Sequence, residues 1–213
     1  MYLAIEGVIG VGKTTLARML QPSMQANLLL EVFEENPFLS DFYSDRQRYA
    51  FQTQIFFLLS RYRQQSQNVP KMLEGGIHLV SDYTFEKDSL FARINLKGDE
   101  LEMYKRVHQA LAEKIPLPDL VVYLRASTDI LMQRIAMRDR SYERAMERSY
   151  IDELNHAYDE FFLDDNDQHQ SPVLTIEAGE LDFVRKFEDL RRVENRIRQQ
   201  LQLSPFQPEL PLT

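Results

Sequence analysis

Five short apolar runs, separated by longer amphipathic stretches, determine the architecture that this sequence predicts. The runs cover residues 2–5, 28–30, 77–80, 120–124 and 173–176. Between them, apolar residues recur at helical spacing over residues 46–67, 86–114, 128–137 and 145–163. Strands that alternate with helices in this way form a parallel sheet with helices on both faces. We therefore expect an α/β fold with a five-stranded parallel sheet.

The C-terminal part of the chain continues this pattern without adding a second core. Residues 181–202 are rich in charged side chains and predict a terminal helix. Residues 204–213 contain three prolines and predict an irregular tail. The chain has 213 residues, of which 44% are hydrophobic, and this is enough for one sizeable core. We expect a single domain over residues 1–203, followed by the tail.

The loop after the first apolar run carries a phosphate-binding pattern. It reads Gly7-Val8-Ile9-Gly10-Val11-Gly12-Lys13-Thr14, and a helical pattern begins directly after it. The glycines let the backbone curl so that its N–H groups face an anion, and the N-terminus of the helix adds a positive dipole. A lysine here can reach the outer phosphates of a nucleoside triphosphate, and a threonine hydroxyl can bind Mg²⁺. We expect these phosphates to be bound by Gly7, Gly10, Gly12, Lys13, Thr14 and Thr15.

The composition narrows the classes of partner. A net charge of −8 argues against a general nucleic-acid-binding surface, and positive charge gathers only locally, between Arg134 and Arg148. The chain has no cysteine, which excludes disulfides and cysteine metal sites. No apolar run reaches membrane length, and the N-terminus lacks the pattern of a signal peptide. These features predict a cytoplasmic protein that binds neither nucleic acid nor a membrane.

Two carboxylates follow predicted strands, where open parallel sheets bind their ligands. Glu31 follows the second apolar run and would lie beside the phosphate loop if its strand neighbours the first. There it could accept a proton from an attacking hydroxyl or bind the metal, and the alternative is a solvated acid at a strand end. Asp82 follows the third run, where it could bind the metal, directly or through water, or could cap a turn.

An arginine-rich stretch follows the fourth predicted strand. Arg134 and Arg138 are four residues apart and share a helix face, and Arg140 lies in the break after them. Guanidinium groups grip phosphate oxygens with two hydrogen bonds and stay ionised. Such a run is often only a solvated helix face. Its position in a phosphate-loop protein favours a mobile lid over about residues 138–148.

The helix predicted over residues 46–67 places polar side chains among aromatic ones. Gln54 and Arg61 are seven residues apart and therefore lie on one face. A glutamine amide offers both a donor and an acceptor, as the edge of a nucleobase requires. The neighbouring Phe56 and Phe57 could sandwich a ring or could simply belong to the core. The four histidines are scattered and show no metal-ligand spacing.

Together these segments resemble the deoxyribonucleoside kinase family, in particular its bacterial deoxyadenosine/deoxyguanosine kinase branch. The resemblance runs from about Tyr2 to Phe162. It rests on the phosphate loop, residues 31–39 leading to Phe42-Tyr43, Phe51-Gln52-Thr53-Gln54 with Ser60-Arg61, residues 82–88 and residues 134–140. The resemblance implies a P-loop kinase fold that acts as a homodimer with ATP and Mg²⁺.

The resemblance also implies roles for individual residues. Glu31 takes the place of the general base, with Thr14, Asp82 and Glu31 on the metal side. Matching positions for the substrate are Gln54 for pairing with the base, Arg61 for supporting its edge, Asp88 near its amino or carbonyl group, and Tyr43 with Glu143 for the sugar 3′-hydroxyl. The lid arginines are Arg134, Arg138 and Arg140, of which Arg134 is expected near the adenine of ATP.

One departure from the family pattern affects the chemistry. Many members carry an acid-Arg-Ser triplet after the third strand, and its arginine contacts the 5′-hydroxyl and the base-side glutamate. This chain has Asp82-Tyr83-Thr84 instead. Tyr83 can form a hydrogen bond there but carries no positive charge. Either a lid arginine takes over, or the activity or substrate differs from the usual one.

The sequence thus predicts ATP-dependent phosphorylation of the 5′-hydroxyl of a deoxynucleoside, with deoxyadenosine or deoxyguanosine favoured, in nucleotide salvage. Lys13, magnesium, Arg138 and Arg140 would stabilise the charge on the transferred group. A thymidylate-type nucleoside monophosphate kinase is the alternative enzyme, and the absence of an Asp-Arg pair after the third strand weakens it. A non-catalytic nucleotide-binding or switch protein is the other alternative. A guanine switch would need an Asn-Lys-x-Asp motif, which residues 95–99 do not form.

Overall fold

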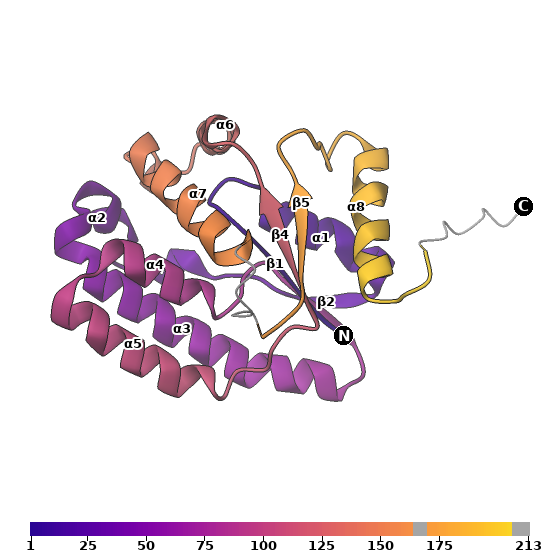
Figure 1. Cartoon of the computed structure of the whole chain (residues 1–213), viewed down its shortest axis with the longest axis horizontal. Helices are drawn as coiled ribbons and strands as arrows, with labels where there is room; N and C mark the ends of the chain where they lie inside the picture. The colour runs from indigo at the N-terminus through magenta and orange to yellow at the C-terminus, as the bar shows by residue number, and fades with distance from the viewer. Residues whose placement is uncertain (164–169, 206–213) are drawn as a thin grey trace, which may run out of the picture.

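A computed structural model of the chain describes residues 1–163 and 170–205 (Figure 1). Five strands form one sheet in the order β2-β3-β1-β4-β5, and all neighbouring strands are parallel. The strands are β1 (Tyr2–Gly7), β2 (Ala26–Leu29), β3 (His78–Ser81), β4 (Leu120–Arg125) and β5 (Val173–Glu177). The expected five-stranded parallel sheet is confirmed.

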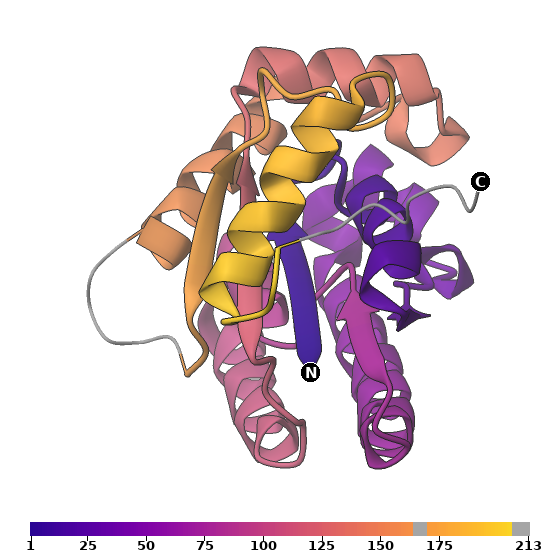
Figure 2. The ribbon, with the colours of Figure 1, turned by 90° about the vertical axis from the view of Figure 1, so that its right-hand side faces the viewer.

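Helices cover both faces of this sheet. They are α1 (Lys13–Met24), α2 (Leu39–Ser44), α3 (Arg46–Glu74), α4 (Lys87–Asn95), α5 (Gly98–Ala112), α6 (Thr128–Arg138), α7 (Arg148–Leu163) and α8 (Phe187–Gln200), with short 3₁₀ turns η1 (Phe33–Glu35) and η2 (Ser141–Glu143). Figure 1 shows α1 and α8 on one side of the strands and α2 to α5 with α7 on the other. In Figure 2, α8 lies in front of the sheet and α6 lies above the strands.

The central strands form because they are apolar along their whole length. Leu3, Ala4 and Ile5 of β1 are each 0% exposed, as are Leu120 and Val122 of β4. A parallel strand with helices on both faces has no solvent side, so its sequence runs continuously apolar instead of alternating. This rigid centre positions the loops at the carboxyl ends of the strands.

The order of the strands corrects one expectation. β3 lies between β1 and β2, so the strand before Glu31 is not the neighbour of the first strand. The reason is the crossover connection, which returns the chain to the sheet one position further along and leaves room for β3 to pair with both strands. Asp82, which follows β3, is therefore the carboxylate beside the phosphate loop, and Glu31 lies one strand further out.

Helix boundaries also differ from the pattern. The stretch over residues 86–114 is two helices, α4 and α5, separated at Leu96 and Lys97. Gly98 adopts a φ of 55° at this break, a conformation that other residues rarely accept. The helix expected over residues 46–67 continues as α3 to Glu74, with Pro70 inside it. The short α2 was not anticipated.

The structure bears only in part on the expected tail, the domain bounds and the absence of a membrane span. Most of the irregular tail expected over residues 204–213 lies outside the described residues, and the single domain over residues 1–203 stays a prediction. Within residues 1–163 and 170–205, no helix combines the length and the apolar character that crossing a membrane requires.

Candidate active site

The phosphate loop takes a shape that needs its glycines. Gly7 has a φ of 144°, and a Cβ there would lie 2.5 Å from the backbone oxygen of Leu124. Gly12 has a φ of 109° and caps α1, which begins at Lys13. The loop therefore closes tightly against β4 and turns directly into the N-terminus of a helix, where unpaired N–H groups attract anions.

Lys13 extends back over this loop. Its Nζ donates a hydrogen bond to the carbonyl oxygen of Gly7 at 2.6 Å and to that of Val8 at 3.3 Å. Burial, and then the positive charge of the nearby Lys87, lower the pKa of Lys13 to about 8. A phosphate bound here would supply the negative charge that keeps this ammonium protonated.

Asp82 connects the phosphate loop to the segment after β2. One carboxylate oxygen, Oδ2, accepts a hydrogen bond from the Thr14 hydroxyl, and the other accepts one from the backbone N–H of Glu31 at 2.8 Å. Mg²⁺ in phosphate-transfer sites takes oxygen ligands, usually one or two carboxylates together with substrate phosphates and waters. Thr14 and Asp82 offer such oxygens side by side. The described residues contain no group of three acidic or histidine side chains that would hold a metal alone.

Glu31 is held by two cations. Arg61 donates to Glu31 Oε1 through both Nε, at 3.0 Å, and Nη2, and Lys87 Nζ donates to Oε2 at 2.7 Å. Burial raises the pKa of the Glu31 carboxyl, but the two positive charges outweigh this effect and bring the pKa below its usual range. Glu31 is therefore an ionised carboxylate in a sheltered position. It is not the solvated strand-end acid that sequence position alone allows.

Two polar side chains line the same cleft further along, and a third lies buried behind them. Arg61 forms a second ion pair, from Nη1 to Asp88 Oδ1, and the Asp88 side chain is 1% exposed. Gln54 is also buried and lines the cleft with Arg61. Over residues 1–163 and 170–205 the Gln54 amide has no hydrogen-bond partner, so it retains donors and an acceptor for a ligand. The structure thus brings Gln54, Arg61 and Asp88 together as the sequence pattern suggests.

The predicted lid closes over this cleft through η2. Arg138 forms a fork of two hydrogen bonds with Glu143, from Nε at 2.9 Å and from Nη2 at 2.5 Å, and Arg140 lies 3.7 Å from the same carboxylate. The Arg140 guanidinium also lies over the ring of Phe33, 4.3 Å from its centre. Both lid arginines line the cleft with Lys13. Neither pairs with Glu31, so a lid arginine does not replace the missing arginine of the triplet.

Tyr43 and Glu143 lie where a sugar could reach both. Both side chains line the cleft, although they come from α2 and from the lid. Tyr142 of the lid stacks on Tyr43 with ring centres 6.5 Å apart. These contacts join the lid to the substrate side of the cleft.

Arg134 faces a second cleft on the other side of the phosphate loop. Its guanidinium donates to the carbonyl oxygens of Val11 and Ala178, each at 2.9 Å. It therefore joins the phosphate loop to the segment between β5 and α8. This cleft is lined by Gly10, Gly12, Thr15, Arg134, Met137 and the residues from Gly179 to Arg185.

Sequence reasoning missed Lys87 and Phe33. Lys87 is 4% exposed and bonded to Glu31, but a lone lysine at the start of a predicted helix gave no sign of this. Tyr83, which was considered for the position of the missing arginine, instead donates to Gln64 Oε1 at 2.5 Å.

The features of this site define a class of protein, the P-loop kinases with a hydroxyl acceptor. They are the phosphate loop, the bridging Asp82, the partly buried carboxylate of Glu31 and the arginines that line the cleft. The family model for deoxynucleoside kinases matches residues 3–202 of this chain. The chain belongs to the deoxynucleoside kinase family.

Individual relatives agree with this assignment. The chain is 34% identical over 200 residues to a deoxyguanosine kinase of Bacillus subtilis, covering 93% of this chain and 96% of that protein. It is 35% identical over 184 residues to a deoxyadenosine kinase of Dictyostelium discoideum, covering 84% and 73%. A solved structure of a deoxyadenosine kinase from M. mycoides with bound dATP has a TM-score of 0.79 at 26% identity, covering 93% of this chain and 99% of that one.

Proposed function

We propose that this kinase transfers the γ-phosphoryl group of ATP to the 5′-hydroxyl of a purine deoxynucleoside. The observation that carries this proposal is one cleft lined by Lys13, Glu31, Gln54 and Arg61, with Asp88 buried behind it as the ion-pair partner of Arg61. A nucleoside whose base lies against Gln54 and Arg61 would extend its sugar toward the phosphate loop.

The reacting end of the cleft supports a proton transfer to Glu31. The carboxylate is ionised and partly buried, as a general base for a hydroxyl requires, although its lowered pKa makes it a weak base that acts as the O–P bond forms. Thr14 and Asp82 would hold Mg²⁺, which supplies charge neutralisation at the phosphates. Because both oxygens of Glu31 are already held by cations, we place the metal on Thr14 and Asp82 and keep Glu31 for the proton.

The donor side of the proposal uses the phosphate loop and the lid. Gly7, Gly10, Gly12, Lys13, Thr14 and Thr15 would bind the phosphates, with Arg134 beside the adenine of ATP. Arg138 and Arg140 would exchange their contact with Glu143 for the transferred phosphoryl group, where charge spreads in the transition state. Glu143 would then be released toward the 3′-hydroxyl, together with Tyr43.

The base end of the cleft supports a preference among nucleosides. Arg61 holds Asp88 as an ionised acceptor, which suits a base with an exocyclic amino group. Thymine would present its carbonyl O4 to this carboxylate, acceptor against acceptor. An unmatched buried contact of that kind costs several kcal/mol at most, enough for discrimination of about 10²-fold. Two relatives are named for deoxyguanosine and deoxyadenosine, in keeping with a purine substrate.

The test of this function compares acceptors that differ in the phosphate they already carry. With ATP and Mg²⁺, deoxyadenosine should become its 5′-monophosphate while thymidine monophosphate remains unchanged, and the products are separated by anion exchange. Phosphorylation of thymidine monophosphate without transfer to any deoxynucleoside would favour the thymidylate-type alternative. Binding of ATP with no transfer to either acceptor would favour a non-catalytic binding protein.

We also propose that the enzyme works as a homodimer in the cytoplasm. The layer formed by α3 and α5 exposes apolar side chains that a partner would cover, among them Leu59 at 49% and Met103 at 56% exposed. Sedimentation equilibrium should give twice the 25.2 kDa mass of the chain. A single species at the mass of one chain at micromolar concentration would contradict the dimer.

A further inference from the structure

Lys87 is a buried cation in the first turn of α4. Its side chain is 4% exposed, and its ammonium has one hydrogen-bond acceptor among the described residues, Glu31 Oε2 at 2.7 Å. It lines the cleft together with Lys13 and Arg138. Removing an ammonium from water costs free energy unless an anion compensates for its charge. A lysine with only a structural role would avoid this cost by extending its ammonium into solvent. A lysine buried at this point therefore calls for a function.

Lys87 and Arg61 divide the two oxygens of Glu31 between them. Oε1 accepts both hydrogen bonds from Arg61, through Nε and Nη2, whereas Oε2 accepts only the one from Lys87 within the described part of the chain. Each carboxylate oxygen has about two lone-pair positions. Oε1 is therefore filled by protein donors, and Oε2 retains one position for a hydroxyl from the substrate.

Asp88, the residue after Lys87, shows in which order the charged side chains follow one another along the cleft. Asp88, next to Lys87 on α4, pairs with Arg61 Nη1, so two consecutive residues of one helix bracket the Arg61–Glu31 pair. The resulting chain of charges runs from Asp88 through Arg61 and Glu31 to Lys87. Asp88 lies at the end proposed for the base, and Lys87 lies at the end that also contains Lys13.

We propose that Lys87 is a positioning residue that holds Glu31 Oε2 in place as the proton acceptor of the reaction. In the transfer, the O5′–H bond of the nucleoside breaks and its proton moves to Oε2, while the O5′–Pγ bond forms and the bond from Pγ to the β-phosphate oxygen breaks, releasing ADP. Lys87 keeps its own protons throughout. This inference rests on the proposed role of Glu31 as the base.

A double-mutant cycle tests this role, because Lys87 is to act only through Glu31. Lys87→Met removes the charge at nearly constant length and should lower kcat about 10²-fold, with KM for deoxyadenosine changed less than about threefold. Lys87→Arg, which keeps a cation, should restore kcat to within about tenfold of wild type. The control Lys105→Met, which removes an exposed lysine paired with Glu102, should leave both constants unchanged.

The decisive comparison uses Glu31→Gln. In that background Lys87→Met should cause no further loss beyond about threefold, since the acceptor that it positions is already gone. The proposal would be overturned if the kcat losses of the two single variants multiply in the double variant, if Lys87→Met keeps a normal kcat, or if only its KM rises. A Lys87→Met protein that no longer folds or no longer binds deoxyadenosine would also overturn it, because Lys87 would then be needed for the architecture of the cleft. A wild-type protein without transfer to deoxynucleosides would instead disprove the proposed function, and an active Glu31→Gln variant would disprove the base.

Discussion

Glu31 and Lys13 owe their chemical states to their neighbours more than to their own side chains. Arg61 and Lys87 keep Glu31 ionised despite its burial, and Lys87 together with burial makes Lys13 easier to deprotonate. A site with two cations around one carboxylate and a third at the phosphate loop is prepared for a highly charged ligand. The charges of Glu31, Arg61, Lys87 and Lys13 therefore suit a cleft that binds a triphosphate.

Removing the charge of Lys13 tests the phosphate-loop assignment. Lys13→Ala should abolish transfer, because it removes a positive charge from the transferred phosphates and with it about 3 kcal/mol or more of transition-state stabilisation. Steady-state kinetics should show a loss in kcat/KM of at least about 10²-fold, with Lys105→Ala as a surface control. Near-normal turnover in a folded Lys13→Ala protein would be incompatible with the assignment.

Neutralising Glu31 tests the base. Glu31→Gln should still bind deoxyadenosine but should lower kcat by about 10²–10⁴-fold, the usual effect of losing a general base. Glu177→Gln is a matched control, because Glu177 is the last residue of β5, its side chain is 69% exposed, and it also pairs with an arginine, Arg125. If kcat survives in Glu31→Gln and only KM rises, Glu31 is a binding residue.

At the scale of elements, the lid and α2 meet through aromatic contacts. Phe33, from η1, lies under Arg140 and 5.8 Å from the ring of Tyr142, which in turn stacks on Tyr43. Cation–π contacts of this kind are each worth about 0.5–2 kcal/mol. Phe33, which lies outside the proposed lid, therefore contributes to the contacts that hold the lid against the cleft.

Phe33→Ala should weaken this closure. We expect kcat/KM for ATP to fall about threefold to thirtyfold, because the closed arrangement loses the contacts of Arg140 and Tyr142. Phe187→Ala is the control, since Phe187 also carries an arginine, Arg191, over its ring but is 60% exposed on α8. Unchanged kinetics in Phe33→Ala would show that the lid closes without this ring.

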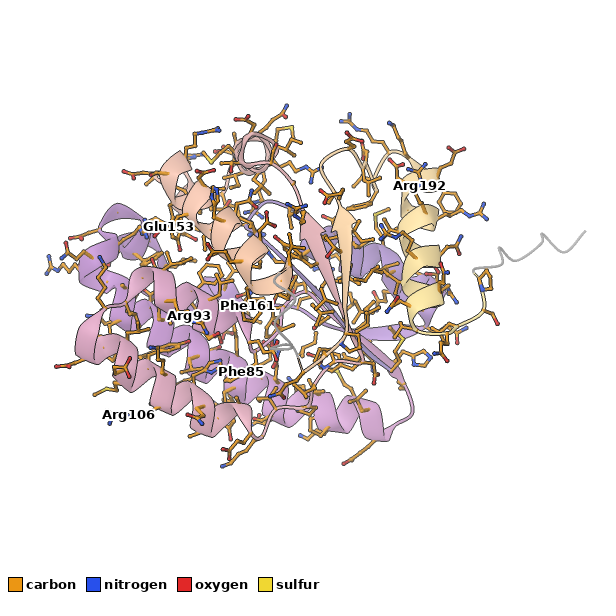
Figure 3. All side chains as sticks on the ribbon, viewed as in Figure 1. Phe85, Arg93, Arg106, Glu153, Phe161 and Arg192 are labelled. Atoms are coloured by element: carbon orange, nitrogen blue, oxygen red, sulfur yellow. The ribbon has the colours of Figure 1, made fainter. Side chains whose placement is uncertain are left out.

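The packing of α5 against the loop after β3 predicts a pH effect on stability. The ring of His108 stacks on Phe85, labelled in Figure 3, with ring centres 4.8 Å apart. Its Nε2 lies 3.3 Å from the Phe85 carbonyl oxygen, which requires the tautomer with a proton on Nε2. Burial lowers the pKa of His108 below its ordinary value of 6.5. The folded protein therefore binds this proton less readily than the unfolded chain.

Because the folded pKa lies below the unfolded one, the contribution of neutral His108 is present above pH 6.5 and is lost as the pH falls through its folded pKa. Urea titrations at pH 7.5 and pH 5 should show a smaller fall in unfolding free energy for His108→Gln than for the wild type. Equal falls in the two proteins would contradict this account. His156→Gln is the control, because that histidine is exposed and its pKa is raised.

Elements that depend on local patterns could be predicted from the sequence, whereas features that depend on contacts between distant residues could not. The strands were predictable because a buried parallel strand has to be continuously apolar, and the phosphate loop because Gly7 and Gly12 need their φ angles. The sequence pattern does not reveal the break between α4 and α5, because helical periodicity continues through Leu96. The break becomes visible only in the backbone, where Gly98 at the start of α5 has a positive φ. Lys87 was missed because its burial depends on Glu31, 56 residues away in the sequence.

For the whole molecule, the order of the strands decides which functional residues meet. β3 separates β1 from β2, so Asp82 lies between Thr14 and Glu31 and bonds to both. Hydrophobic patterning contains no information on this order, because each strand would be equally apolar in any central position. The helices α3 and α4 cover one side of the sheet (Figure 1), and α3 brings Arg61 to Glu31.

The two clefts lie on opposite sides of the phosphate loop. Arg106 of α5 and Arg192 of α8 lie at opposite sides of the molecule in Figure 3. The cleft proposed for the acceptor lies on the side of α2 to α5, and the cleft proposed for the base of the donor lies beside the loop that leads from β5 to α8. The phosphate loop lies between them, where one phosphoryl group can pass from donor to acceptor.

The most direct test of this account is the relative kcat/KM for deoxyadenosine, deoxyguanosine, deoxycytidine and thymidine, measured with ATP and Mg²⁺. The cleft lined by Gln54 and Arg61, with Asp88 paired to Arg61 behind it, predicts the two purine deoxynucleosides first, deoxycytidine next, and thymidine lower by about 10²-fold or more. In Asp88→Ala this gap should narrow, because the preferred substrates lose their acceptor and thymidine loses its clash. A wild-type enzyme that phosphorylates thymidine as well as deoxyadenosine would contradict the account.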